Sequence, residues 1–252
     1  MRKNKTFYNV VSKTKLLDTF KKNKVMFNTY FGKEQPIGPV VNWSLDFSNP
    51  ETQQEFVNAP VYTSSDFEPG KLYKRNDAMV ITPLELGTDI KGNGSGSSGR
   101  AGFKYVFPEV PTGKVVTIEH EVKINKTLEQ PTYASTTNLY SLFLANPTST
   151  TPFGISLSPS SINCRNSSGS DSGTYNWPEG LTIYDQLTLK MEYNDVTKIC
   201  KYYLNGSLLH TTPAIETAEA PYGIIPSAAS NNTAQNQTSV TLYSVDVTVS
   251  EV

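Results

Sequence analysis

Hydrophobic and polar residues alternate in short runs from residue 40 to the end of the chain, the pattern of half-buried β-strands. The run at 41–47 places Val41, Trp43 and Leu45 on one face, and the run at 116–124 does the same with valine, isoleucine and one histidine. Further strands are predicted at 79–82, 103–107, 139–145, 153–157, 187–193, 200–204 and 240–249. The pattern therefore predicts an all-β fold built as an antiparallel β-sandwich.

A tight hairpin is predicted between the strands at 200–204 and 208–210. The two residues that connect them are Asn205 and Gly206. Both tolerate positive φ, which the two-residue hairpin turn requires at each position. This dipeptide sets the register of that strand pair.

The N-terminal segment follows a different period. Residues 4–22 show helical spacing, with lysines on much of the opposite face, and 23–40 resemble a linker. The apolar positions are Phe7, Val10, Val11, Leu17 and Phe20. We expect a short helical arm and linker at 1–39, followed by a sandwich domain at 40–252. The arm either lies on its own domain, docks on another subunit, or contacts a nucleic acid or a membrane surface.

Charge is distributed unevenly along the 252 residues. Residues 1–24 carry eight lysines and arginines against one aspartate, so they are +7, and the rest of a chain with net charge −1 is −8. With this balance, binding of nucleic acid by the whole chain is not expected. No apolar run is long enough for a membrane span, and the basic start lacks the apolar stretch of a secretory signal.

The segments 185–195 and 200–209, together with Trp177 and the closing strand at 240–249, resemble the concanavalin A-like and laminin-G-like sandwiches of the lectin–glucanase superfamily. In that superfamily a strand ending in a Tyr/Asp turn precedes a strand that closes in Tyr-x-Asn-Gly. The resemblance implies a jelly-roll sandwich whose last strand pairs near the first, here about 41–47. The superfamily includes lectins, glycan-binding modules, glycosidases and virion proteins, so the resemblance does not by itself assign a function.

No catalytic site is expected. Glycosidases of this superfamily place several acids on one face of a strand, where two act as nucleophile and acid/base. The nearest match here puts Glu119, Glu121 and Lys123 on one face, because side chains repeat every two residues. A lysine stands where a third acid is needed, so a solvated strand face is the favoured interpretation.

Metal and cofactor sites are not expected either. His120 falls on the apolar face of its strand, and the chain lacks the paired cysteine or histidine spacing of a zinc site. The glycines at 94–99 match a dinucleotide fingerprint in letters only, because a strand follows them instead of a helix. Whether Cys164 and Cys200 are bridged stays open at this point.

Aromatic residues gather near loops and strand ends in the middle of the domain. They are Tyr133, Tyr175, Trp177 and Tyr184. Exposed rings of this kind stack on sugars, which makes them candidate glycan-binding residues. The alternative is that most of them fill or border the sandwich core.

The combination of a basic arm, a lectin-like sandwich and no export signal favours a non-enzymatic structural or binding protein of a virus or bacteriophage particle. A capsid decoration, fibre or tail-associated component is made in the host cytoplasm and resides in the virion. Its partners are then other virion proteins or copies of itself, held through the arm, and surface glycans. The alternatives are a carbohydrate-binding lectin module, a glycoside hydrolase, and a jelly-roll capsid protein whose arm binds the genome.

Overall fold

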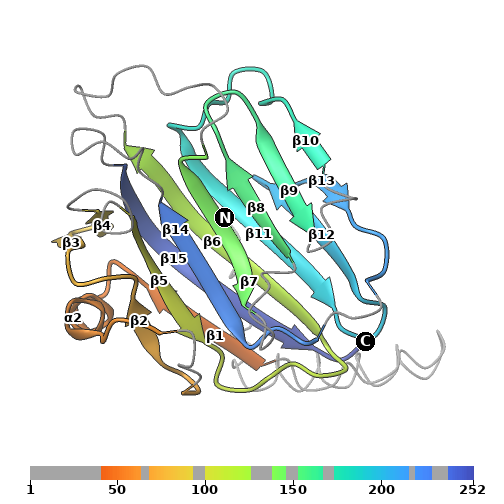
Figure 1. Ribbon diagram of the computed structural model, residues 1–252, viewed down its shortest axis with the longest axis horizontal. Coiled ribbons are helices and arrows are strands. Elements are labelled where there is room, and N and C mark those ends of the chain that lie inside the picture. The colour runs from red at the N-terminus through yellow and green to blue at the C-terminus, as the bar shows by residue number, and fades with distance from the viewer. Residues whose placement is uncertain are drawn as a thin grey trace, which may run out of the picture. The chain divides into compact units, whose positions relative to one another are not determined.

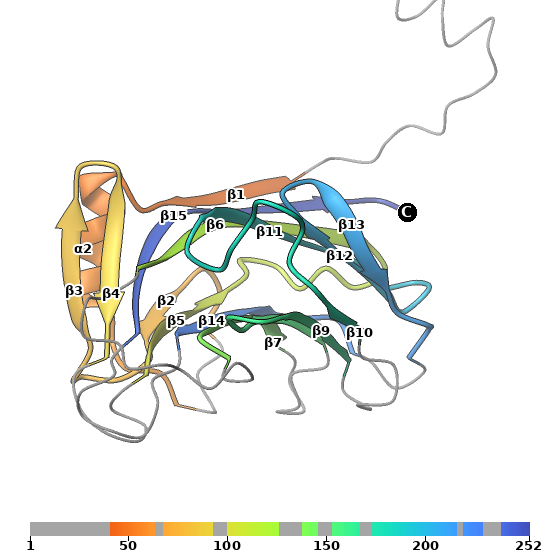
Figure 2. The same cartoon turned by 90° about the horizontal axis from the view of Figure 1, so that it is seen from above.

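A computed structural model describes residues 41–63, 68–92, 100–125, 138–145, 153–166, 173–215, 219–228 and 238–252. These residues form two sheets that pack face to face as layers (Figures 1 and 2). All pairs between named strands are antiparallel. The predicted antiparallel sandwich is confirmed, whereas the arm and linker at 1–39 lie outside the described residues.

The larger sheet has eight strands. In spatial order they are β13 (Ser207–Thr211), β12 (Ile199–Leu204), β11 (Gln186–Asn194), β6 (Val115–Asn125), β15 (Ser239–Ser250), β4 (Gly87–Lys91) and β3 (Val80–Leu84). The eighth, β1 (Val41–Asp46), pairs with β15 beyond the stretch that β4 occupies. Val41 pairs with Val249 and Asp46 with Ser244, which confirms the predicted pairing of the first and last strands.

The smaller sheet has seven strands. In order they are β10 (Gly173–Tyr175), β9 (Ile162–Asn166), β8 (Phe153–Leu157), β7 (Tyr140–Ala145), β14 (Gly223–Ala228), β5 (Ala101–Val106) and β2 (Leu72–Lys74). The predicted strand at 153–157 has the bounds of β8, and those at 103–107 and 139–145 differ from β5 and β7 by one or two residues.

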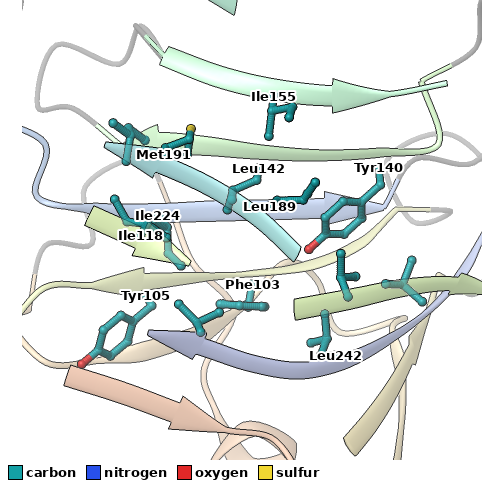
Figure 3. Packing of buried hydrophobic residues seen from close by; sticks show 14 of the residues in the cluster. Phe103, Tyr105, Ile118, Tyr140, Leu142, Ile155, Leu189, Met191, Ile224 and Leu242 are labelled. Carbon is teal, nitrogen blue, oxygen red and sulfur yellow. The ribbon is translucent and has the colours of Figure 1, made fainter. Parts of the chain in front are cut away.

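The core lies between the sheets and takes the apolar face of each strand. Figure 3 shows Phe103 and Ile224 of the smaller sheet meeting Ile118, Leu189 and Leu242 of the larger one, and all five are fully buried. Along β6 and β11 buried and accessible residues alternate without a break. Polar side chains on the other face of these strands are thereby directed away from the core.

The predicted hairpin between β12 and β13 is present. Asn205 has φ 48° and Gly206 has φ 80°, and Leu204 pairs with Ser207 across the turn. The turn therefore has the positive φ at both positions that selects Asn-Gly.

A short helix, α2 (Pro50–Asn58), was not predicted. Its N-cap is Asn49, whose side-chain oxygen accepts a hydrogen bond from the amide of Glu51 at 2.8 Å, and a proline occupies the first turn. Asn-Pro-Glu is a helix-start signal, but the helix is too short for its hydrophobic period to stand out among strands. It stands beside the β3–β4 hairpin at one end of the sandwich (Figures 1 and 2).

Candidate functional site

A cavity of about 710 Å³ opens on the outer face of the eight-stranded sheet, the face turned away from the core. The turn between β3 and β4 forms one wall, the end of β1 forms another, and side chains of β6, β11 and β15 form the floor. Its lining residues are Asp46, Ser48, Leu84, Glu85, Leu86, Glu121, Lys123, Asn125, Gln186, Thr241, Tyr243 and Ser244.

The wall of the cavity is fixed by one buried amide of helix α2. The Nε2 atom of Gln53 donates to the backbone oxygens of Phe47, Leu84 and Gly87, each at 2.8 Å. These carbonyls belong to the segment after β1 and to the two ends of the β3–β4 turn. Gln53 is 7% exposed, so water competes little for these bonds and the turn is held beside β1.

The same junction is joined to β15. The amide of Phe47 donates to the Tyr243 oxygen at 2.9 Å, and Thr88 Oγ1 donates to the Phe47 oxygen at 2.9 Å. Gly87 lies so close to β15 that a Cβ atom there would be 2.5 Å from the Leu242 oxygen. Only glycine permits this approach, so its absent side chain brings the turn against the strand.

A β-bulge directs Tyr243 into the cavity. The pairing of β15 with β6 shifts register between Leu242 and Ser244, so one extra residue enters β15. The inward residues are Val240 and Leu242 before the bulge and Val245 after it. A bulge redirects a side chain, and here both Tyr243 and Ser244 line the cavity. The sequence carries this signal as a one-residue break in the alternation at 242–245, which a count of β-branched residues does not reveal.

The floor of the cavity is held by a network of side chains on the four adjacent strands β11, β6, β15 and β4. Thr241 Oγ1 donates to Asp89 Oδ1 at 2.5 Å, and Asn125 Nδ2 donates to Thr241 Oγ1 at 3.1 Å. Gln186 Nε2 donates to Glu121 Oε1 at 2.5 Å. The amides and carboxylates of the floor are thus oriented by one another before any ligand is present.

Asp46 and Tyr243 differ in what their surroundings do to their acidity. The side-chain and backbone hydrogen bonds from Ser48, at 2.6 and 2.9 Å, lower the pKa of Asp46 and keep it ionised. Burial raises the pKa of Tyr243, and the negative charges of Asp89 and Glu121 raise it further. Tyr243 therefore remains a neutral phenol beside carboxylates.

Comparison with known proteins finds a match in structure only. No protein-family model matches the sequence, and no curated protein matches it. A structure of peanut lectin with a 9mer peptide aligns at a TM-score of 0.52 with 10% identity, covering 84% of this chain and 98% of the lectin chain. The fold is a lectin-like β-sandwich.

Two further structures show how much of larger proteins the chain spans. A sialidase aligns at a TM-score of 0.50 with 8% identity, over 70% of this chain and 16% of its own. The binding domain of botulinum neurotoxin serotype D aligns at 0.49 with 14% identity, over 80% of this chain and 47% of its own. The chain spans less than half of either of these. The likeness to the peanut lectin structure, at 10% identity, shows the fold alone.

The aromatic residues predicted to bind glycans lie elsewhere in the lectin-like sandwich. Tyr175, Trp177 and Tyr184 are partly buried against the core, and none of the three lines the cavity. Tyr175 Oη is hydrogen-bonded to a ring nitrogen of His210 at 2.7 Å, and Trp177 Nε1 donates to a backbone oxygen at 3.0 Å. Tyr133 lies outside the described residues. A glycan role for these four residues stays a prediction.

The acidic face of β6 is arranged as predicted. Glu119, Glu121 and Lys123 share the outer face, and only the last two line the cavity. Across the strands Glu119 pairs with Asp246 on one side and Lys190 on the other. The absence of catalysis stays a prediction.

His120 is a core residue, as its position on the apolar face of β6 predicts. It is fully buried, with Nδ1 at 2.7 Å from the Ser244 oxygen and Nε2 at 2.5 Å from Tyr140 Oη. A carbonyl only accepts, so Nδ1 carries the hydrogen and Nε2 accepts from the phenol. Burial lowers the pKa of His120 to about 4. The neutral ring links the two sheets and holds the bulge under the cavity floor.

Three further features of the described residues bear on function: possible metal ligands, the two cysteines and the apolar character of the helices. They contain no group of three histidine, cysteine or acidic residues placed to hold a metal ion. Cys164 and Cys200 are buried free thiols. Among the helices in the part of the chain that the structure describes, none has the length and apolar character needed to cross a membrane.

Proposed function

We propose that the protein is a carbohydrate-binding module that holds a sugar in the cavity on the outer face of the eight-stranded sheet. The observation that carries the proposal is the composition of that cavity. It brings the Tyr243 ring and two exposed leucines together with carboxylate, amide and hydroxyl groups.

A sugar ring needs both kinds of surface. Its C–H face packs on aromatic or aliphatic groups, and its hydroxyls donate to carboxylates and accept from amides. Leu86 is 74% and Leu84 is 40% exposed, so both offer apolar area on the wall. The volume of about 710 Å³ lies within the roughly 300–1,000 Å³ of small-molecule sites.

The cavity is also organised in advance. Gln53 fixes the turn, the bulge fixes Tyr243, and the network around Thr241 fixes the floor. A site that does not have to be ordered on binding avoids part of the entropic cost of association. The lectin-like fold, shared with a protein named as a lectin, is in keeping with this function.

The hypothesis of a virus-particle component depends on residues 1–39, which lie outside the described residues. A role in a virion, docking through the arm and a virion location therefore stay predictions. They are compatible with glycan binding by the sandwich, and the truncation described in the Discussion tests them.

The proposal is tested on a glycan array followed by calorimetry with the best ligand. We expect Tyr243→Ala to weaken binding by at least ~10-fold, the effect of losing roughly 1.4 kcal/mol at a central aromatic contact. The matched control is Tyr203→Ala, because Tyr203 lies on the same sheet but does not line the cavity. Tyr203 pairs with Lys190 on the neighbouring strand, and the Lys190 ammonium lies over its ring.

Thermal unfolding of both variants shows whether the fold survives. Retained binding in a folded Tyr243→Ala protein, or equal loss in the Tyr203→Ala control, would contradict the proposed site. A full array without any bound glycan would contradict the function itself.

A further inference from the structure

The charge of the cavity restricts the class of sugar that it holds. Of the described residues that line it, three carry a carboxylate, Asp46, Glu85 and Glu121, and one carries an ammonium, Lys123. Asp89 stands directly behind Thr241 and adds a further negative charge to the floor. The surroundings of any bound group are therefore anionic on balance.

Some of this negative charge is still available to a ligand. Asp46 lines the cavity as an ionised carboxylate, because the hydrogen bonds from Ser48 to its Oδ1 atom lower its pKa. Glu85 sits in the β3–β4 turn and takes part in none of the side-chain hydrogen bonds or ion pairs within the described residues. Glu121, by contrast, already accepts from Gln186.

The positive charge of Lys123 does not make the described lining of the cavity neutral or positive. Lys123 faces its cross-strand partner Gln186 and is close enough to Asp185 to act on it. The backbone and side-chain hydrogen bonds from Thr182 lower the pKa of Asp185, and the positive charge of Lys123 contributes to the same shift. Lys123 thus lies between carboxylates of the cavity and a carboxylate outside it.

We infer that the cavity selects amino sugars, accepts neutral sugars more weakly and rejects sugars that carry a carboxylate or sulfate. An ammonium group placed near the carboxylates of Asp46 and Glu85, which both line the cavity, forms charge-assisted hydrogen bonds. A neutral sugar desolvates these carboxylates with weaker compensation, and an anionic sugar adds like-charge repulsion. The inference rests on the proposed function and names its ligand class.

The test compares sugars that differ only in charge. Glucose, glucosamine and glucuronate form one set, and galactose, galactosamine and galacturonate form a second that covers the common epimer. Each is titrated into ¹⁵N-labelled protein at the same low ionic strength, and dissociation constants are taken from the amide shifts of cavity residues. We expect the amino sugar of a set to bind about tenfold more tightly than the neutral one, with the uronate weakest. Added salt should narrow the gap.

A double variant assigns the preference to the cavity. Asp46→Asn with Glu85→Gln should bring the amino and neutral sugars to within about twofold, because the charge-assisted bonds become neutral ones. The matched control, Glu179→Gln with Glu192→Gln, removes two negative charges that do not line the cavity, and should keep the preference of the wild type.

The outcomes separate the two claims. Uronates that bind as tightly as amino sugars, with shifts that vanish in Tyr243→Ala, would overturn the charge inference and leave the proposed function standing. An amino-sugar preference retained in the double variant would also overturn it. Absence of Tyr243-dependent shifts with all six sugars would count against both.

Discussion

Replacing Gln53 by leucine tests whether the wall of the cavity is held as described. The change keeps the size and helix propensity of the side chain but removes the two N–H groups that serve three carbonyls. The Phe47 oxygen retains its bond from Thr88, so the loss falls on the oxygens of Leu84 and Gly87. An unsatisfied buried acceptor costs about 1–3 kcal/mol, and the Leu84 bond is only partly buried.

We therefore expect about 1–2 kcal/mol for the Leu84 oxygen and about 1–3 kcal/mol for the Gly87 oxygen, so the free energy of unfolding should fall by about 2–5 kcal/mol. In a domain of this size that corresponds to a melting temperature lower by roughly 4 to 20 °C. Chemical denaturation gives the first quantity and calorimetry the second. Hydrogen exchange at 84–88 should accelerate more than exchange in β6 or β11, because the turn is released locally.

Gln54→Leu is the matched control, since Gln54 is the next residue of the same helix and is exposed. It should change stability by less than about 0.5 kcal/mol. Equal effects of the two substitutions, or an unchanged exchange rate at 84–88 in Gln53→Leu, would refute the idea that this amide holds the turn.

Three further predictions concern the core, the hairpin and the arm. The pKa of His120 is lowered to about 4, whereas that of an unfolded histidine is ~6.5. The free energy of unfolding should therefore be constant with respect to this group above pH 6.5 and should fall by about 3 kcal/mol as the pH drops to 4. Urea titrations should show this fall in the wild type and a smaller one in His120→Gln. Gly206→Val should lower the free energy of unfolding by at least ~1 kcal/mol, because φ is 80° at this position and a β-branched residue is strained there. Gly96→Val, at a position outside the described residues, should have little effect when both variants are compared by thermal unfolding. Deletion of residues 1–35 should leave a folded sandwich that no longer joins its particle or oligomer; an unchanged size with a lower melting temperature would show that the arm stabilises its own domain instead.

The sequence was sufficient for the architecture because the alternation of buried and exposed residues is a local property. The faces of β6 and β11 followed from it. The Asn205–Gly206 turn followed from the two residue types, and the pairing of β1 with β15 followed from the resemblance to lectin-like sandwiches. Helix α2 was missed because nine residues with two buried side chains give too short a helical period to distinguish from a loop.

The cavity was not predictable in the same way. It assembles five segments that are distant in the chain, and its wall depends on Gln53, a polar residue whose role follows only from which carbonyls surround it. The break in alternation at Tyr243 was present in the sequence, but it indicates a bulge and not what the bulge faces. For Tyr175 and Trp177 the sequence left glycan binding and core packing both open, because residue type does not reveal that their polar atoms bond within the protein.

Locating a bound glycan on the protein decides whether the cavity on the eight-stranded sheet is the binding site. A ¹⁵N-labelled sample is titrated with the best ligand from the array, and amide shifts are mapped on the chain. We expect the largest shifts at 84–86, 121–125 and 241–244, around the cavity on the outer face of the eight-stranded sheet. Shifts centred instead on Tyr175, Trp177 and Tyr184, with the cavity residues unchanged, would contradict it.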